Sequence, residues 1–153
     1  MTTEWTHAGI PVTEIDPEMV GFIYIITNMI DGRKYIGKKN AFFKKTKYKV
    51  VTQKNGKKVK KKIRSLVPSD WPTYFGSSVE LQNDVEKLGQ ENFSREIVRF
   101  CKTASEMSYY EAHQQFTSDA LLHPTKFYNS WIMCRVRRDH LLKNENSTTF
   151  LDS

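Results

Sequence analysis

The chain has 153 residues, 24 of them Lys or Arg and 17 Asp or Glu, so its formal net charge is +7. An apolar content of 39%, with three Trp and nine Phe, excludes a disordered basic tail and predicts one folded domain. No apolar run is long enough for a membrane span, and residues 1–20 lack the pattern of a secretory signal. We therefore expect a soluble, cytoplasmic protein without a membrane partner. The cysteines Cys101 and Cys134 form no Cys-x-x-Cys pair, which argues against a disulfide framework or a structural zinc site.

The first strands are predicted after an irregular lead-in over residues 1–20, where two prolines interrupt regular structure. The β-branched and aromatic run Phe22–Thr27 and the run Arg33–Gly37 predict a β-hairpin. Side chains alternate faces along a strand, so a connection with an even number of residues places Tyr24 and Tyr35 on one face. An odd connection or a bulge would separate them.

The positive charge is concentrated in one segment. Residues 38–64 contain 13 Lys and Arg and no carboxylate, which leaves 11 basic and 17 acidic groups, net −6, for the other 126 residues. Local basicity of this kind marks a surface for an anionic partner.

The basic segment is patterned as a second hairpin, which we expect to turn at Asn55-Gly56 as a two-residue loop. On one face this register pairs Lys47 with Arg64, Lys49 with Lys62, Val51 with Lys60 and Gln53 with Lys58. Like charges directly opposite one another destabilise a ribbon unless an anion neutralises them. The alternative is a solvated lysine-rich loop, but charge on one face favours a ribbon that enters a DNA groove.

Two helices and a third strand are predicted downstream. A capping box at Ser77 and Glu80 begins the first helix, and a second one at Thr103 and Glu106 begins the next. Between them, the alternating run Phe93–Cys101 predicts a strand.

These elements predict an α/β (α+β) fold, with a small three-stranded antiparallel sheet flanked by helices and a basic β-hairpin inserted after the second strand. We expect the domain to occupy residues 21–138, with the basic insertion at residues 38–70 and a polar C-terminal tail at residues 139–153. The segment Phe127–Arg138, apolar and then basic, is expected to form a last short strand or helix.

Four ordered elements resemble the GIY-YIG nuclease superfamily: Ile23-Tyr24, Tyr35-Ile36-Gly37, Glu111 within Tyr110–Gln115, and Asn129 in Tyr128-Asn129. The stretches 74–78 (Tyr-Phe-Gly-Ser-Ser) and 89–93 (Gly-Gln-Glu-Asn-Phe) are also similar to phage-type members. One Tyr-Ile-Gly alone would be weak evidence, whereas four ordered elements over residues 21–132 are more specific.

The resemblance implies hydrolysis of phosphodiester bonds with Mg²⁺ (or Mn²⁺). Tyr24 would be the general base for the attacking water, but a phenol of pKa near 10 is ionised in only about one molecule in a thousand at neutral pH. The metal or Lys38 must therefore lower that pKa. Glu111 would be the metal ligand, Tyr35 would hydrogen-bond the scissile phosphate or the water, and Asn129 would brace the site.

Each of these roles has a structural alternative. Tyr24 and Tyr35 also suit strand aromatics that pack on a helix, and Glu111 suits an exposed helix position. Asn129 suits a turn. Within the ordered motif we favour catalytic roles for the two tyrosines.

The sequence departs from the superfamily at one position. An arginine is usual about eight residues beyond the glycine of Tyr-Ile-Gly, where its planar fork would hold phosphate oxygens. Lys45 occupies that position here. Either Lys45 or Arg64 substitutes as the phosphate clamp, or the arginine role is lost and catalysis with it.

We therefore expect a metal-dependent endonuclease that cuts double-stranded DNA, in the host cytoplasm if the chain is encoded by a phage. The expected phosphate-binding residues are Lys38, Lys39, Lys47, Lys49, Lys58, Lys60 and Lys62. Specificity would be modest, or would come from the basic hairpin or from a homodimer. Two other classes remain open: a nucleic-acid-binding module that has lost hydrolysis, and an interaction protein whose basic hairpin binds an acidic protein.

Overall fold

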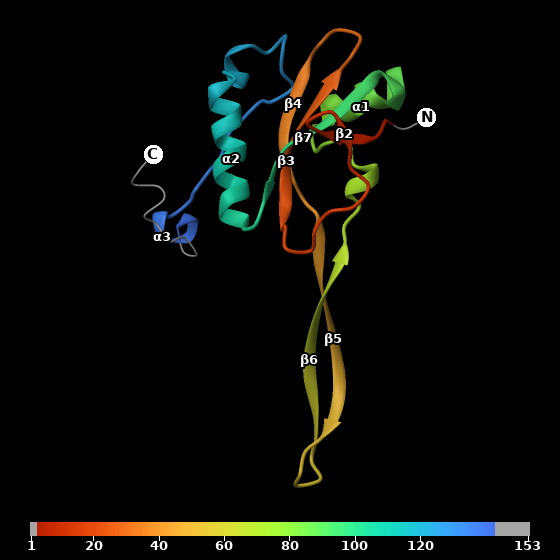
Figure 1. Cartoon of the computed structure of the whole chain (residues 1–153), viewed down its shortest axis with the longest axis vertical. Coiled ribbons are helices and arrows are strands. Elements are labelled where there is room, and N and C mark those ends of the chain that lie inside the picture. The colour runs from red at the N-terminus through yellow and green to blue at the C-terminus, as the bar shows by residue number, and fades with distance from the viewer. Residues whose placement is uncertain (1–2, 143–153) are drawn as a thin grey trace.

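A five-stranded mixed sheet organises the protein, seen in a computed structural model that describes residues 3–142 (Figure 1). From one edge to the other, its strands are β2 (Ile10–Pro11), β1 (Trp5–His7), β7 (Phe93–Cys101), β3 (Gly21–Asn28) and β4 (Lys34–Asn40). Neighbouring strands are antiparallel, except that β1 and β7 are parallel. The expected α/β class is confirmed. The described part of the chain contains no helix long and apolar enough to cross a membrane.

The sheet has more strands than the three expected, because β1 and β2 lie within the predicted lead-in. Trp5 explains this addition: its side chain is buried, its indole N–H donates to the Trp71 carbonyl at 2.8 Å, and its ring lies edge-on to Phe22 and Tyr24. Burial of this aromatic side chain holds β1 against β7. Pro11 is tolerated because β2 is an edge strand.

The β3–β4 hairpin has the even connection that brings the two tyrosines together. The Asn28 N–H donates to the Arg33 carbonyl at 2.8 Å, so four residues, Met29–Gly32, connect the paired strands. In this register Tyr35 lies opposite Ile26, on the face that also carries Tyr24. The two phenol rings are 6.2 Å apart between centroids, so the shared face is confirmed.

Two helices cover opposite faces of the sheet (Figure 1). Helix α1 (Val79–Leu88) packs Leu81 and Val85 into the main core, and α2 (Ala104–Thr117) packs Met107 into a smaller core on the other face. Three short 3₁₀ segments, η1, η2 and η3, and a last helix α3 complete the described elements; their bounds are Trp71–Thr73, Gln90–Asn92, Ala120–Leu122 and Arg138–Leu141.

The first helix begins one residue later than its predicted capping box. Ser78, not Ser77, is the N-cap, and its hydroxyl accepts the N–H of Leu81 at 3.3 Å. Glu80 does not close a box, because its carboxylate pairs with Arg33. The cap of α2 is as expected, since Thr103 accepts the N–H of Glu106.

The basic hairpin consists of β5 (Phe42–Thr52) and β6 (Lys58–Pro68), which form a separate two-stranded ribbon projecting from the body (Figure 1). Its predicted register is wrong by one residue. The Gln53 N–H pairs with the Lys57 carbonyl, so Lys54–Gly56 forms a three-residue loop with Gly56 at φ +82°. A type I turn closed by a left-handed glycine replaces the two-residue turn.

The register shift moves side chains between faces, as a one-residue slip must. Lys47 lies opposite Ile63 rather than Arg64, and Lys49 lies opposite Lys61. The expected single basic face is therefore wrong, and both faces of the ribbon carry cations.

The C-terminal segment runs along the free edge of β4 instead of forming the expected strand or helix. Lys34 and Phe127 form an isolated parallel bridge, and the Tyr128 N–H donates to the Lys34 carbonyl at 2.8 Å. Beyond it the backbone is irregular up to α3. Of the expected polar tail, residues 143–153 lie outside the described residues.

One buried cation fixes the loops under the sheet. The Arg95 guanidinium donates to the carbonyls of Thr3, Pro72 and Tyr74, and burial lowers its pKa to about 10. Arg95→Met leaves these acceptors without their donor, so we expect a loss of about 3 kcal/mol of unfolding free energy in urea denaturation.

Arg99→Met is the matched control, because this exposed arginine of the same strand lies over the Tyr110 ring at 3.6 Å. It should cost only about 0.5 kcal/mol. Equal losses in both variants would show that Arg95 has no special role in the fold.

Candidate active site

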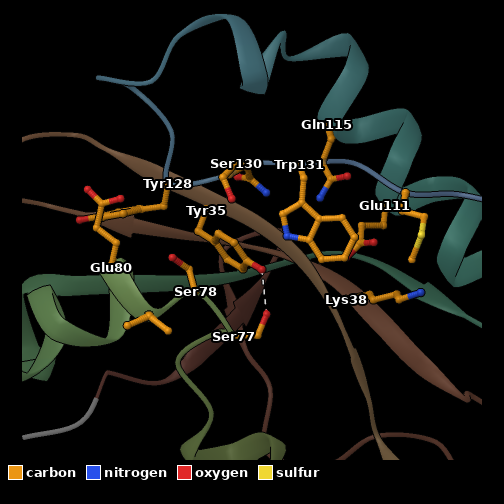
Figure 2. Close-up of a pocket in the computed structure, with 13 residues that line it drawn as sticks. Tyr35, Lys38, Ser77, Ser78, Glu80, Glu111, Gln115, Tyr128, Ser130 and Trp131 are labelled. Atoms are coloured by element: carbon orange, nitrogen blue, oxygen red, sulfur yellow. Dashed lines mark hydrogen bonds between the residues drawn. The ribbon is translucent and has the colours of Figure 1, made fainter.

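A cleft of about 710 Å³ lies at the exposed edge of β4 (Figure 2). Side chains from β4, from the start of α1, from α2 and from the segment after Phe127 form its walls. They are Tyr35, Lys38, Ser77, Ser78, Val79, Glu80, Glu111, Gln115, Tyr128, Asn129, Ser130, Trp131 and Met133. Four of the predicted site residues thus line one cavity: Tyr35, Lys38, Glu111 and Asn129.

Tyr24 lies beneath this cleft rather than in its wall. Its side chain is fully buried, and its hydroxyl lies against Gly37, the residue opposite it on β4. A Cβ at position 37 would be 2.4 Å from that hydroxyl and 3.0 Å from a ring carbon of Tyr35. The glycine of Tyr-Ile-Gly is therefore required by the space that the two phenols occupy.

The Tyr24 hydroxyl has no hydrogen-bond partner of ordinary geometry among the described residues. Burial raises the pKa of this phenol well above its usual value, and the neighbouring phenols of Tyr74 and Tyr35 and the Glu111 carboxylate raise it further. We expected a nearby cation to lower the pKa of Tyr24, but none of the described protein groups does so. All the described groups around Tyr24 raise its pKa, so a cation outside these groups would be needed to lower it.

Tyr35 presents its hydroxyl to the cleft. The oxygen lies 2.8 Å from the Ser77 hydroxyl, and either group can be the donor (Figure 2). This contact is available because Ser78, not Ser77, caps α1. Burial raises the pKa of Tyr35 as well, while the hydrogen bond with Ser77 opposes that change.

Glu111 reaches the cleft from α2. Burial raises the pKa of its carboxyl, and the charge and a backbone hydrogen bond of Lys38 oppose the increase. The Lys38 ammonium donates to the Ser108 hydroxyl at 3.0 Å. A carboxylate and an ammonium group therefore face the same cavity, with the carboxylate partly removed from water.

Asn129 braces the wall of the cleft. Its side-chain oxygen accepts the Ile36 N–H at 3.0 Å, and its amide donates to the Ile36 carbonyl at 2.8 Å. Gln115 of α2 donates to the same carbonyl at 3.1 Å. These bonds tie α2 and the C-terminal segment to β4 next to Gly37.

The remaining predicted basic residues lie outside the cleft lining. Lys45 and Arg64 are on the ribbon, opposite Ser65 and Thr46 respectively. The other ribbon candidates are Lys47, Lys49, Lys58, Lys60 and Lys62. Lys39 is engaged elsewhere: its ammonium is 2.6 Å from Asp70, where it lowers the pKa of that carboxyl, and lies over the Tyr74 ring.

Comparison with known proteins gives the same family as the four ordered sequence elements. A family model described as "Putative endonuclease segE, GIY-YIG domain" matches residues 5–132. The chain belongs to this GIY-YIG family. It is 29% identical over 111 residues, 72% of its length, to "Putative endonuclease segE" of Enterobacteria phage T4, and it spans 40% of that relative. No solved structure gives a significant match.

The donor atoms of this GIY-YIG cleft fit a hard divalent cation. Among the described residues no group of three or more His, Cys, Asp or Glu side chains could enclose a metal. Mg²⁺ needs less: it binds through one or two carboxylates and fills its shell with water and substrate phosphate oxygens. Glu111 supplies that carboxylate, and the unpartnered Tyr24 hydroxyl lies close enough for the charges of the two groups to interact.

Trp131 is a cleft residue that the sequence reasoning missed. It is 67% exposed although it is a tryptophan, and its indole points into the cleft, seen between Tyr35 and Glu111 in Figure 2. The only signal in the sequence is its position two residues after Asn129. Ser77 was assigned to the helix cap, so its contact with Tyr35 was also missed.

The exposure of Trp131 gives a direct measurement of cleft occupancy. Of the three tryptophans, Trp5 and Trp71 are 2% and 6% exposed, so Trp131 should account for most fluorescence quenching by acrylamide, a neutral quencher that DNA does not repel. In EDTA, bound duplex DNA should lower the quenching constant severalfold. Trp131→Phe should remove the quenchable component without unfolding the protein. Quenching that is unchanged by bound DNA would show that DNA does not enter this cleft.

Proposed function

We propose that the protein is a metal-dependent endonuclease that hydrolyses phosphodiester bonds of double-stranded DNA. The observation that supports this most is the convergence of the family's elements at one place: Tyr35, Glu111 and Asn129 line a single cleft, and Tyr24 lies directly beneath it. Membership of a family named for endonucleases supports nuclease chemistry in general.

Tyr24 is the proposed general base. Its buried hydroxyl has no hydrogen-bond partner of ordinary geometry within residues 3–142, an arrangement that costs stability and is typical of groups kept for function. The Tyr35 hydroxyl, which is hydrogen-bonded to the Ser77 hydroxyl, would hold the attacking water or a phosphate oxygen at the surface of the cleft. Asn129 and Gln115 would keep β4, and so both phenols, in place through the Ile36 backbone.

Glu111 is the proposed ligand of Mg²⁺ or Mn²⁺. A bound divalent cation would stabilise the negative charge of the reacting phosphate and lower the pKa of a nearby water or phenol. That contribution is needed here, because burial raises the pKa of Tyr24 well above its usual value. Glu111 would otherwise be a partly buried carboxylate with a single lysine nearby.

Lys38 is the proposed phosphate clamp of the cleft. It directly follows Gly37, lines the cavity and is exposed, whereas the ribbon positions Lys45 and Arg64 do not line it. A lysine supplies charge without the bidentate geometry of arginine, so it would stabilise the transition state less directionally.

The setting of the reaction follows from the relative. A similar chain in a phage of enterobacteria supports action in the cytoplasm of a bacterial host.

The metal requirement gives the first test. Purified protein should nick plasmid DNA with Mg²⁺ or Mn²⁺ and not with EDTA, and Glu111→Gln should slow cleavage at least about a hundredfold. Mg²⁺ should also raise the melting temperature of the wild type but not of Glu111→Gln. Glu86→Gln, an exposed position on α1 outside the cleft lining, is the control and should behave as wild type. Full activity of Glu111→Gln in EDTA would exclude the proposed site.

Tyr24→Phe should separate stability from activity. It removes a buried hydroxyl that makes no hydrogen bond of ordinary geometry to the described residues, so we expect the unfolding free energy to rise by about 1 kcal/mol. Cleavage should fall at least about a hundredfold, as for loss of a general base. Urea denaturation and plasmid nicking measure the two effects on one preparation.

Tyr128→Phe is the contrasting variant. The Tyr128 hydroxyl donates to Asp84 at 2.7 Å and accepts from Asn28 at 3.1 Å. Its removal should therefore lower the unfolding free energy, while the folded protein should still cleave DNA. If Tyr24→Phe cuts DNA as well as the wild type, Tyr24 is a packing residue.

A second candidate function has one specific observation in its favour. In the described part of the chain no arginine lines the cleft, so the scaffold could serve as a DNA-binding module that no longer hydrolyses its ligand. That function predicts salt-sensitive DNA binding without cleavage under any divalent metal.

A further inference from the structure

The strand register sorts the cations of the ribbon into two rows. Lys45, Lys47 and Lys49 follow one another at alternate positions of β5 and so lie on one face. Lys58, Lys60, Lys62 and Arg64 do the same on β6, but on the opposite face. One basic row therefore lies along each strand, and the two rows lie on opposite faces.

The residues opposite the two basic rows are uncharged, except Lys61 opposite Lys49. Ile63 is opposite Lys47, whereas Tyr48 and Val50 are opposite Lys62 and Lys60. These apolar side chains are 42%, 67% and 58% exposed, respectively.

Within residues 3–142, the rest of the protein covers neither face of the ribbon. Nearly all residues of β5 and β6 are exposed, and the ribbon extends away from the sheet and helices in Figure 1. An isolated two-stranded hairpin is only marginally stable in water. With this many cations and no carboxylate in residues 38–64, its complement is a polyanion with apolar surface between its charges.

We propose that the ribbon lies in the major groove of double-stranded DNA, with the β5 row on one phosphate backbone and the β6 row on the other. The proposal rests on the proposed function in one respect, that the substrate is duplex DNA, but it concerns a surface separate from the cleft. When a ribbon lies along a groove, its two edges face the two backbones. A basic row on each strand places cations at both edges.

The dimensions agree with this placement. Eleven residues per strand extend about 37 Å at about 3.4 Å per residue, close to one turn of B-DNA, about 34–36 Å. The major groove, about 12 Å wide, admits a two-stranded ribbon. Long lysine side chains can reach a backbone from either face.

The chain connects the ribbon directly to the cleft. β4 carries Tyr35 and Lys38 and ends at Asn40, and β5 begins at Phe42. The Ser69 N–H donates to the Ala41 carbonyl at 2.9 Å, which closes the base of the ribbon. DNA held by the ribbon would therefore lie next to the cleft.

Two matched triple variants test the proposal: Lys45→Gln, Lys47→Gln, Lys49→Gln on β5, and Lys58→Gln, Lys60→Gln, Lys62→Gln on β6. Binding of a labelled 30-base-pair duplex is measured by anisotropy in EDTA over a range of salt. Each triple should weaken binding at least tenfold at low salt. Each should also make the slope of log K against log salt shallower by about 2.7, which is about 0.9 for each of three lost phosphate contacts.

The controls separate groove binding from general charge attraction. Lys87→Gln, Lys102→Gln, Lys126→Gln removes three exposed cations outside the ribbon and should change affinity less than twofold. Lys→Arg at the three β5 positions should restore the wild-type salt slope. Duplex RNA of the same sequence should bind more weakly than DNA, because its major groove is too narrow for the ribbon. Both ribbon triples should reduce this preference, with near-ultraviolet circular dichroism confirming the fold of each variant.

The outcomes distinguish this inference from the endonuclease proposal. If one triple equals the control triple, or if RNA and DNA duplexes bind equally, the two-backbone arrangement is wrong, even if the wild type cuts DNA. If both triples lose affinity as expected but no metal supports cleavage, the inference stands and the endonuclease proposal fails. No retention of duplex DNA at low salt would overturn the inference and favour an acidic protein as the partner.

Discussion

The contact between the Tyr24 ring and Gly37 is the constraint on which the site depends. The β3–β4 register sets the two residues opposite one another, and no side chain larger than hydrogen fits at position 37. Tyr35, two residues earlier on β4, shares that face and closes over Tyr24. The exposed edge of β4 is then free to bind Asn129 and Gln115 through the Ile36 backbone, which places the Glu111 helix beside the phenols.

The cleft and the ribbon differ in their electrostatics. Burial raises the pKa values of Tyr35 and Glu111 in the cleft and of Tyr24 beneath it, so these side chains resist negative charge there. A phosphate would add negative charge, and Lys38 is the lysine that lines the cavity. The ribbon, in contrast, has an excess of cations and few anionic neighbours. The proposed chemistry in the cleft would therefore need an added cation, whereas the proposed affinity for DNA would come from the ribbon.

The sequence was sufficient where local rules decide the structure. Side-chain alternation placed Tyr24 and Tyr35 on one face for an even connection, which the hairpin has, and Thr103 marked the start of α2. The sequence was insufficient where one residue or a distant contact decides the strand register or the number of strands. Gly56 adopts a left-handed conformation after a type I turn, which shifted the ribbon register, and Trp5 joins the sheet through a carbonyl 66 residues away. Exposure of Trp131 likewise depends on a segment without regular structure.

The two basic rows also limit what the ribbon can contribute to sequence choice. Phosphate contacts fix the position of a protein on a duplex but carry no sequence information. The face that carries the β5 row also presents the apolar side chains of Val59 and Ile63, on either side of Lys61. Apolar groups in the major groove distinguish mainly the methyl group of thymine. A ribbon bound in this way would give strong, salt-sensitive affinity with little sequence preference. Selectivity in cutting would then arise at the cleft, from the bases next to the phosphate that Lys38 would hold.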